Sequence, residues 1–159
     1  QLQLNVWSSN VKGVVGIQEI NNINDIGRID LIKGYQMTPT HLALEYSSEQ
    51  LQRMRGRKKL LIIITDGSPE YRINEYLIPI GNMIKMCKKS FTYARRKTPN
   101  IICLLISSYP SMRQRAKGFT VMDTMKKIFG NKVIECSDID KASERVIKEI
   151  RNIVLRSMK

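Results

Sequence analysis

Two short apolar runs, separated by a long helical pattern, constrain the fold of this chain most. The runs are KLLIIIT at residues 59–65 and IICLLI at residues 101–106. Strands that are buried on both faces of a parallel sheet have this uninterrupted apolar profile. Apolar residues at helical spacing precede and follow each run. After residue 37 this alternation predicts an α/β fold, with a three-layer, doubly wound and mostly parallel sheet.

The remaining segments fit one domain over residues 1–159. Polar and apolar residues alternate at 1–7, and a similar pattern follows at 11–20, which predicts an antiparallel N-terminal hairpin that turns at Ser8-Ser9-Asn10. Residues 21–34 are polar and predict a loop with a short helical turn at 29–32. The other expected elements are helices at 39–54, 73–97, 121–129 and 139–158 and a strand at 132–136.

Residues at the helix ends support these boundaries. Thr38 is a suitable cap for the first helix, with Pro39 in its first turn, and Gly56 ends that helix. Pro79 and Gly81 indicate that the second regular helix starts late. Asp123 is expected at the start of the third helix, and Ser137 with Asp140 forms a capping-box variant for the last helix.

Composition excludes several classes of protein. Apolar residues make up 42% and charged residues 26% of the 159 residues, as in ordinary globular domains. The longest apolar run is far shorter than the roughly 20 residues of a membrane span, so no membrane association is expected. The three cysteines, an odd number without CxxC spacing, argue against a disulfide framework or a zinc knuckle. Cys103 and Cys136 are expected to be buried, and Cys87 to lie in a helix, in a protein of the reducing cytoplasm.

The formal net charge of +13 is the unusual term of the composition. Many cations lie where helices end and strands begin, at one edge of the expected sheet. Cations are favoured at helix C-termini, typically by about 0.3–1 kcal/mol each, which explains these positions without a ligand. A basic face that binds nucleic acid or an acidic protein is the alternative, although aromatic residues are not interleaved with the cations. The members of this expected basic face are Arg55, Arg57, Lys58, Lys59, Arg95, Arg96 and Lys97.

Polar residues gather where a site is expected in a parallel sheet, beyond the carboxyl ends of its strands. Asp66-Gly67-Ser68-Pro69-Glu70 follows the first apolar run, and Thr38-Pro39-Thr40 precedes the first helix. Carboxylate and hydroxyl oxygens without a nearby thiolate suit Mg²⁺, Mn²⁺ or Ca²⁺ rather than zinc. Gly67 is expected to allow a sharp turn. His41 is the single histidine and is interpreted as exposed or packed rather than catalytic. No base for a serine nucleophile is recognisable, so an enzyme is not expected.

The segments MTPTHLAL at 37–44 and RKKLLIIITDGSPE at 57–70 together resemble the von Willebrand factor A (VWA) domain. The resemblance is closest to the VWA domains of cobalt-chelatase large subunits and of MoxR-associated proteins, and KGFTVMD at 117–123 also fits the chelatase type. It implies a metal-ion-dependent adhesion site in which Asp66 and Thr38 are ligands. Thr40 is a substitute for Thr38, and Glu70 and Ser68 are further oxygen donors at the rim.

One motif of that family is absent from this sequence. The Asp-x-Ser-x-Ser loop, which ends the family's central strand, does not occur, and Ser8-Ser9 is no replacement. The chain is therefore expected to begin after the family's first strand and helix, as an N-terminally incomplete domain. One Asp and one Thr supply few of the six or more oxygen ligands of a hard cation, so a domain without a bound metal is an alternative.

The resemblance implies a protein–protein interaction module rather than an enzyme. In the family, Mg²⁺ or Mn²⁺ keeps an open position for a carboxylate of the partner. Chelatase-type and MoxR-associated members work with AAA+ ATPases, so an AAA+ ATPase is the expected partner. The alternatives are a metal-free scaffold and a nucleic-acid-binding domain that uses the basic face.

Overall fold

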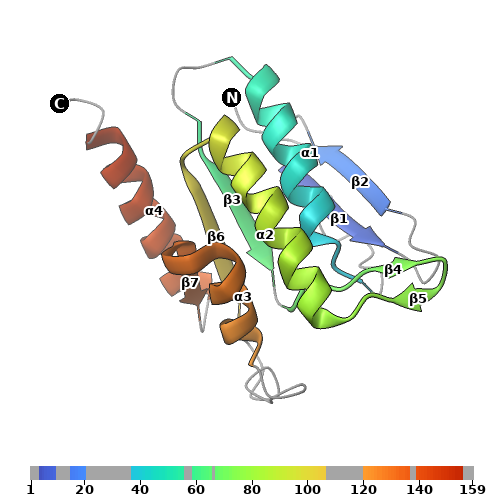
Figure 1. The fold of residues 1–159 in the computed structure, drawn as a ribbon. Coiled ribbons are helices and arrows are strands. Elements are labelled where there is room, and N and C mark those ends of the chain that lie inside the picture. The colour runs from blue at the N-terminus through green and yellow to red at the C-terminus, as the bar shows by residue number, and fades with distance from the viewer. Residues whose placement is uncertain are drawn as a thin grey trace.

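Three parallel strands in the order β3-β6-β7 form the central sheet of the computed structural model, which describes residues 4–9, 15–20, 37–55, 59–65, 67–106, 120–136 and 139–155 (Figure 1). The strands are β3 (Leu61–Thr65), β6 (Ile101–Ile106) and β7 (Val133–Cys136). Ile63 lies opposite Cys103, and Leu105 lies opposite Glu135. The predicted parallel sheet and its apolar runs are confirmed.

Helices separate the strands along the chain. α1 (Thr40–Arg53) precedes β3, α2 (Ile80–Lys97) connects β3 to β6, and α3 (Val121–Phe129) lies between β6 and β7. A 3-10 turn at Gly130–Lys132 follows α3, and α4 (Ile139–Leu155) ends the described chain. All four predicted helices are present. The predicted ends at Gly56 and residue 158, the loop at 21–34 and Ser137 lie outside the described residues.

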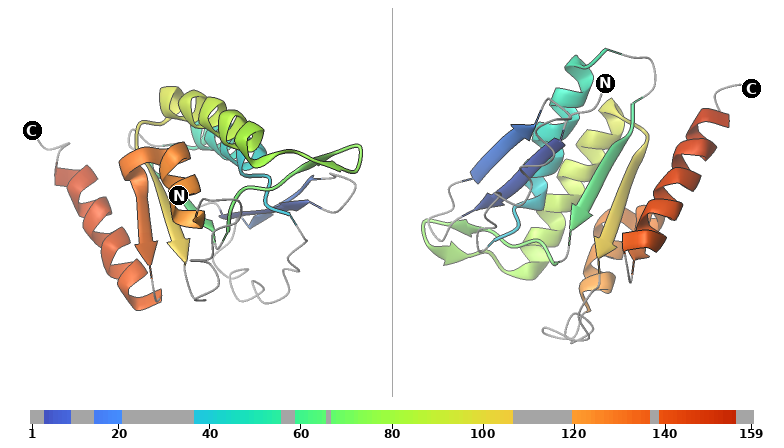
Figure 2. Two further views of the ribbon diagram at one scale, coloured as in Figure 1. Left: turned by 60° about the horizontal axis from the view of Figure 1, so that its bottom comes forward. Right: turned by 180° about the vertical axis from the view of Figure 1, so that it is seen from behind.

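Alternation along β6 divides the core between the two faces of the sheet. Ile101, Cys103 and Leu105 face a large cluster that includes buried side chains of α1, α2 and α3, and Ile102 and Leu104 face a smaller one. Side chains of a strand alternate between its faces, which explains this division. Figures 1 and 2 show α1 and α2 along one face of the sheet and α4 beyond β7. Buried members of the large cluster from the helices include Leu44, Met83, Cys87, Phe91, Met125, Ile128 and Phe129.

The smaller cluster is completed by β7 and α4. Cys136 is buried in it, and Val146 of α4 packs against it. Cys103 and Cys136 are buried and form no disulfide, as predicted, and Cys87 lies in α2, as predicted, where it is also buried. Burial raises the pKa of Cys87 and of Cys103 to about 12, which keeps both thiols protonated at neutral pH. Within the described residues, no helix has both the length and the apolar character to cross a membrane.

β3 departs from the prediction of a strand buried on both faces. Ile63 and Thr65 are buried, whereas the side chain of Ile64 is 52% exposed. Ile64 points to the same face as Ile62, which is only partly buried against the smaller cluster. The reason is the position of β3 at the edge of the three-stranded sheet, where α4, at the far end of the sheet, does not cover it.

The predicted N-terminal hairpin is present as a separate sheet. β1 (Leu4–Ser9) pairs antiparallel with β2 (Val15–Ile20), and Trp7 lies opposite Ile17. Ser8 and Ser9 belong to β1 and not to the turn, which corrects the sequence interpretation. The hairpin lies beyond β3, on the side away from β6, and does not pair with it (Figures 1 and 2).

A second hairpin was not predicted. β4 (Arg72–Ile73) and β5 (Tyr76–Leu77) pair antiparallel through a tight turn, where the sequence pattern indicated a helix from residue 73. Asn74 and Glu75 form the turn with φ values of 48° and 69°. Positive φ at both central residues is typical of type I′ turns, whose twist matches that of paired strands. The regular helix begins late, at Ile80, as Pro79 indicated.

The turn of this second hairpin gives a stability prediction. A residue other than glycine in the left-handed region destabilises the folded state by roughly 1–2 kcal/mol. Glycine has more conformational freedom in the unfolded chain, which lowers the stability of the folded state by about 0.5–1 kcal/mol. Glu75→Gly should therefore raise the free energy of unfolding by about 0.5–1 kcal/mol, measured by urea denaturation. Glu75→Ala removes the same carboxylate but keeps the strain and should give no gain. An equal gain in both variants would contradict this explanation.

The helix N-termini correct one capping prediction and confirm another. Pro39, not Thr38, occupies the N-cap of α1, and no side chain caps that end. α3 begins with a capping box: the Asp123 N–H donates to the Thr120 hydroxyl (3.0 Å), and the Thr120 N–H donates to the Asp123 carboxylate (3.1 Å). Asp123 is thus the predicted helix-start residue. These hydrogen bonds lower the pKa of Asp123, because they favour its ionised form.

Candidate functional site

The two polar segments singled out in the sequence lie against each other. The Glu70 N–H, in the loop after β3, donates to the carbonyl of Thr38, just before α1, over 3.0 Å. Just beyond the end of each segment, the His41 ring packs edge-on against Tyr71, with ring centroids 5.1 Å apart and planes at 68°. Two contacts therefore hold the threonine loop and the β3 loop together at the carboxyl end of the sheet.

The threonine loop is shaped by Pro39. Its φ of −76° and ψ of 63° are those of an inverse γ-turn, in which the Thr40 N–H donates to the Thr38 carbonyl over 2.8 Å. The Thr40 side chain is buried, and its hydroxyl also donates to the Thr38 carbonyl (3.4 Å). Since that carbonyl also accepts from Glu70, its lone pairs are used within the loop. Of the two threonine side chains, that of Thr38 is half-buried and therefore the more accessible.

The β3 loop presents its oxygen atoms at different depths. The buried Thr65 hydroxyl donates to the Gly67 carbonyl (3.3 Å) and accepts from the Gly67 N–H (3.4 Å), which folds the chain back at the strand end. Ser68 is half-buried, Pro69 is buried and Glu70 is exposed. The predicted ligand Asp66 lies outside the described residues. Gly67 has no positive φ, and a Cβ there would meet nothing within 4 Å, so this turn does not require glycine.

His41 is packed rather than exposed, which is one of the two positions that the sequence allowed for it. Its side chain is 5% exposed, and its Nδ1 atom is buried without a hydrogen-bond partner. Burial lowers the pKa of His41, because the imidazolium ion loses hydration, and nearby Glu45 offsets part of this effect. No pattern in the sequence pairs His41 with Tyr71, since the partners lie on different elements.

The donor set of the two loops suits a hard cation. Mg²⁺ and Mn²⁺ accept hydroxyl and carboxylate oxygens as ligands. The two loops offer the hydroxyls of Thr38 and Ser68 and the carboxylate of Glu70. Over the described ranges, which leave out Asp66, histidine, cysteine, aspartate and glutamate form no group of three or more that could hold a metal.

The described members of the expected basic face make contacts that structural roles explain. Lys59 Nζ donates to the Gln52 carbonyl in the last turn of α1 (2.7 Å), and Lys97 forms an ion pair with Glu49 (3.6 Å). Arg95 lies 5.8 Å from the ring centroid of Phe91. Arg96 and Arg55 are exposed, and Arg57 and Lys58 lie outside the described residues. These positions agree with the preference of cations for helix C-termini.

Comparisons with protein-family models, with curated proteins and with solved structures find no match. The residues that the structure describes define an α/β protein, with a three-stranded parallel sheet and two separate antiparallel hairpins among them.

Proposed function

We propose that this chain is a VWA-type protein-interaction module, and not an enzyme, which binds a carboxylate of its partner through Mg²⁺ or Mn²⁺ held at the carboxyl end of β3. Asp66 and Thr38 would ligate the ion, with Ser68 and Glu70 at the rim. The observation that carries the proposal is the 3.0 Å hydrogen bond from Glu70 to Thr38, because it brings the two motif segments of the resemblance into contact.

The topology gives independent support. The proposed domain is a three-layer, doubly wound sheet in which a further strand lies between the N-terminal hairpin and β3. β1 and β2 form a sheet of their own, and β3 has β6 as its partner on one side. Among the described residues no strand pairs with the other edge of β3. In the proposed domain, a strand at that edge would carry further oxygen ligands for the ion.

The proposed partner is an AAA+ ATPase, by the resemblance to chelatase-type and MoxR-associated domains. A carboxylate of such a partner would complete the coordination of the ion, so association would depend on the metal. The buried free thiols of Cys87, Cys103 and Cys136 support a reducing compartment, the cytoplasm, as the place of action.

Metal binding can be tested on the chain alone, with Mn²⁺ as the probe. A ligand that binds only the folded state raises the melting temperature with its concentration. We expect millimolar Mn²⁺ to raise the melting temperature of the wild type and not that of Asp66→Ala. Thr38→Val, which loses only the hydroxyl, should weaken the response, and Thr38→Ser should keep it.

Glu75→Gln is the matched control, because it neutralises an exposed carboxylate at the hairpin tip, away from both loops. It should respond to Mn²⁺ like the wild type. A wild type whose melting temperature ignores Mn²⁺ indicates a metal-free scaffold, and an unchanged response of Asp66→Ala shows that the ion binds elsewhere. Either result rejects the proposal.

A further inference from the structure

The β4–β5 hairpin carries an apolar face that the rest of the domain leaves uncovered. Ile73 lies opposite Tyr76, and the next pair inward is joined by the Ile78 N–H, which donates to the Tyr71 carbonyl (3.0 Å). By the alternation of strand side chains, these four residues share one face. Tyr71 and Ile78 pack against the large core cluster, whereas Ile73 is 52% and Tyr76 is 81% exposed. The apolar face therefore continues outward past the edge of the core.

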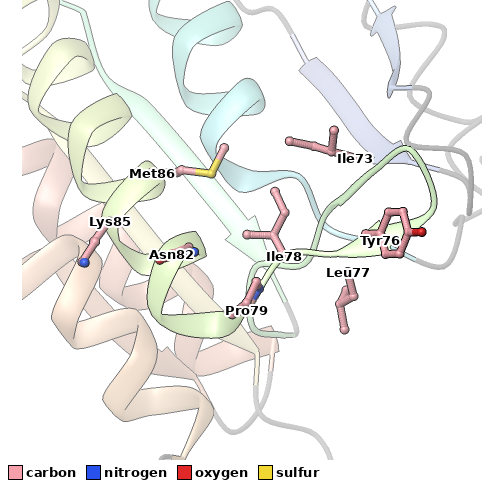
Figure 3. A pocket seen from close by; sticks show the side chains of 8 residues that line it. All are labelled: Ile73, Tyr76, Leu77, Ile78, Pro79, Asn82, Lys85 and Met86. Atoms are coloured by element: carbon pink, nitrogen blue, oxygen red, sulfur yellow. The ribbon is translucent and has the colours of Figure 1, made fainter.

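This face opens into a groove beside the start of α2. The groove has a volume of about 510 Å³, and Ile73, Tyr76 and Leu77 line it from the hairpin (Figure 3). From α2, Asn82, Lys85 and Met86 contribute to the lining. In Figure 3 Ile78 and Leu77 lie on opposite sides of the hairpin. Exposed apolar side chains that gather in one hollow and have a polar rim are typical of interaction sites.

A stripe of cations continues from this groove along α2. Lys85, Lys88, Lys89 and Arg96 recur at helical spacing on its exposed side, and α2 contains six cations but no aspartate or glutamate. A second hollow of about 330 Å³ lies along the stripe, lined by Lys88, Lys89, Thr92, Tyr93 and Arg96. Within the described part of the chain these four cations have no acidic partner, whereas Lys97 pairs with Glu49. The stripe extends from Lys85 to Arg96 and is therefore not confined to the last turn of the helix, where the helix dipole favours cations.

We propose that the groove and the cationic stripe form one docking surface for an acidic segment of another protein. An apolar side chain of that segment enters the groove beside Ile73 and Tyr76, and its carboxylates lie along Lys88, Lys89 and Arg96. From Asn82 to Arg96 the helix rises about 21 Å, which roughly seven residues of extended chain can span. Aromatic anchors in a hollow and complementary charge beside it are the usual means of affinity and of orientation at interfaces.

The chemistry of the surface favours this occupant over two others. A phosphodiester backbone satisfies the cations but offers nothing apolar to the groove. A second copy of this chain, with a net charge of +13, would place one cationic stripe against another strongly basic protein. An acidic segment with an apolar anchor satisfies both halves of the surface. This inference goes beyond the proposed metal site, because no residue of the docking surface belongs to it.

A labelled peptide tests the proposal on the whole chain. The probe is a fluorescein-labelled ten-residue peptide with Trp-Leu at one end followed by glutamates, and its binding is followed by fluorescence anisotropy. We expect saturable binding that weakens with salt. Lys88→Glu with Lys89→Glu should lower the affinity by about tenfold or more, since like charges then face each other. Ile73→Ser with Tyr76→Ser should also weaken binding, although the charge is unchanged.

The controls separate this surface from general charge and from the metal site. Lys126→Glu with Lys148→Glu makes the same change in net charge at exposed positions outside α2 and should leave the affinity within about twofold. Circular dichroism melts verify that each variant folds. Binding should be equal in EDTA and in Mn²⁺, and Asp66→Ala should bind normally, so this proposal and the metal proposal can fail separately.

Three outcomes would overturn the proposal. The first is an equal loss in the α2 variant and the control variant, which indicates attraction by net charge alone. The second is equal binding of an all-glutamate peptide, which shows that the groove contributes nothing. The third is tighter binding of a twelve-nucleotide single-stranded RNA that the α2 substitutions weaken, which assigns the surface to nucleic acid.

Discussion

Phe129→Ala should lower the free energy of unfolding by about 3–5 kcal/mol, the range measured for large-to-small changes of buried aromatic residues. Phe129, the last residue of α3, is 2% exposed and packs edge-on against Phe91 of α2, with ring centroids 5.0 Å apart. It therefore joins two helices over the sheet. Its loss leaves a cavity in the large cluster and removes the contact with Phe91. The folded state therefore loses both the free energy gained by burying the ring and the ring's packing contacts.

Urea denaturation with a matched aromatic control measures this effect. Tyr76→Ala also truncates an aromatic ring, but Tyr76 is 81% exposed, so its loss should change stability by only about 0.5 kcal/mol. Phe129→Leu, which refills most of the volume, should recover part of the loss. Equal effects of the Phe129 and Tyr76 truncations would show that α3 does not pack on the core as described.

Acidification below pH 6.5 should destabilise the protein through His41. Burial holds the pKa of His41 below its ordinary value of 6.5 in the folded state. As the pH falls through 6.5, His41 therefore becomes protonated in the unfolded chain while it stays neutral in the folded chain. The free energy of unfolding falls as a result. The loss continues down to the folded-state pKa and then levels off. Urea denaturation at a series of pH values between 7.5 and 5 measures it.

His41→Phe isolates this contribution, because phenylalanine keeps a ring against Tyr71 and cannot take up a proton. It also removes the buried Nδ1 atom that lacks a hydrogen-bond partner. The variant should lose less stability than the wild type between pH 7.5 and 5. Parallel pH profiles for the two proteins would show that other groups cause the acid sensitivity, and His41 would then have no special role.

The strands of the sheet could be predicted because their chemistry is local. Residues 101–106 are apolar at every position, and β6 is buried on both faces between two neighbouring strands. β3 has an equally apolar sequence, yet Ile64 is 52% exposed. The run of residues specifies a strand, but its place at the edge of the sheet depends on which other strands pair with it. A single sequence does not contain that information.

The β4–β5 hairpin shows a different limit. Apolar residues recur at helical spacing in this segment, at Ile73, Tyr76, Leu77 and Ile80. This spacing predicted a helix where the structure has two very short strands. The turn was also hard to recognise, because Glu75 adopts a positive φ where glycine is the usual residue. Pro79 did indicate the helix start, since proline fixes φ and favours the first turn.

For the candidate site, the sequence predicted the segments but not the bonds between them. The position of both loops at the carboxyl edge follows from the parallel topology, as expected. The contact of Glu70 with Thr38 uses backbone atoms, which every residue has, so no side-chain pattern could reveal it. The same holds for the orientation of Thr40, whose hydroxyl turns inward because of the γ-turn at Pro39.

The helical crossovers between β3, β6 and β7 also bear on how the chain folds. Neighbours in this sheet come from distant parts of the sequence, as in the pairing of Ile63 with Cys103. The two hairpins, by contrast, pair residues that are close in sequence. Closing long loops is slow, whereas a hairpin forms within roughly 1–10 μs. We therefore expect the hairpins to form early and the parallel sheet to assemble in the rate-limiting step.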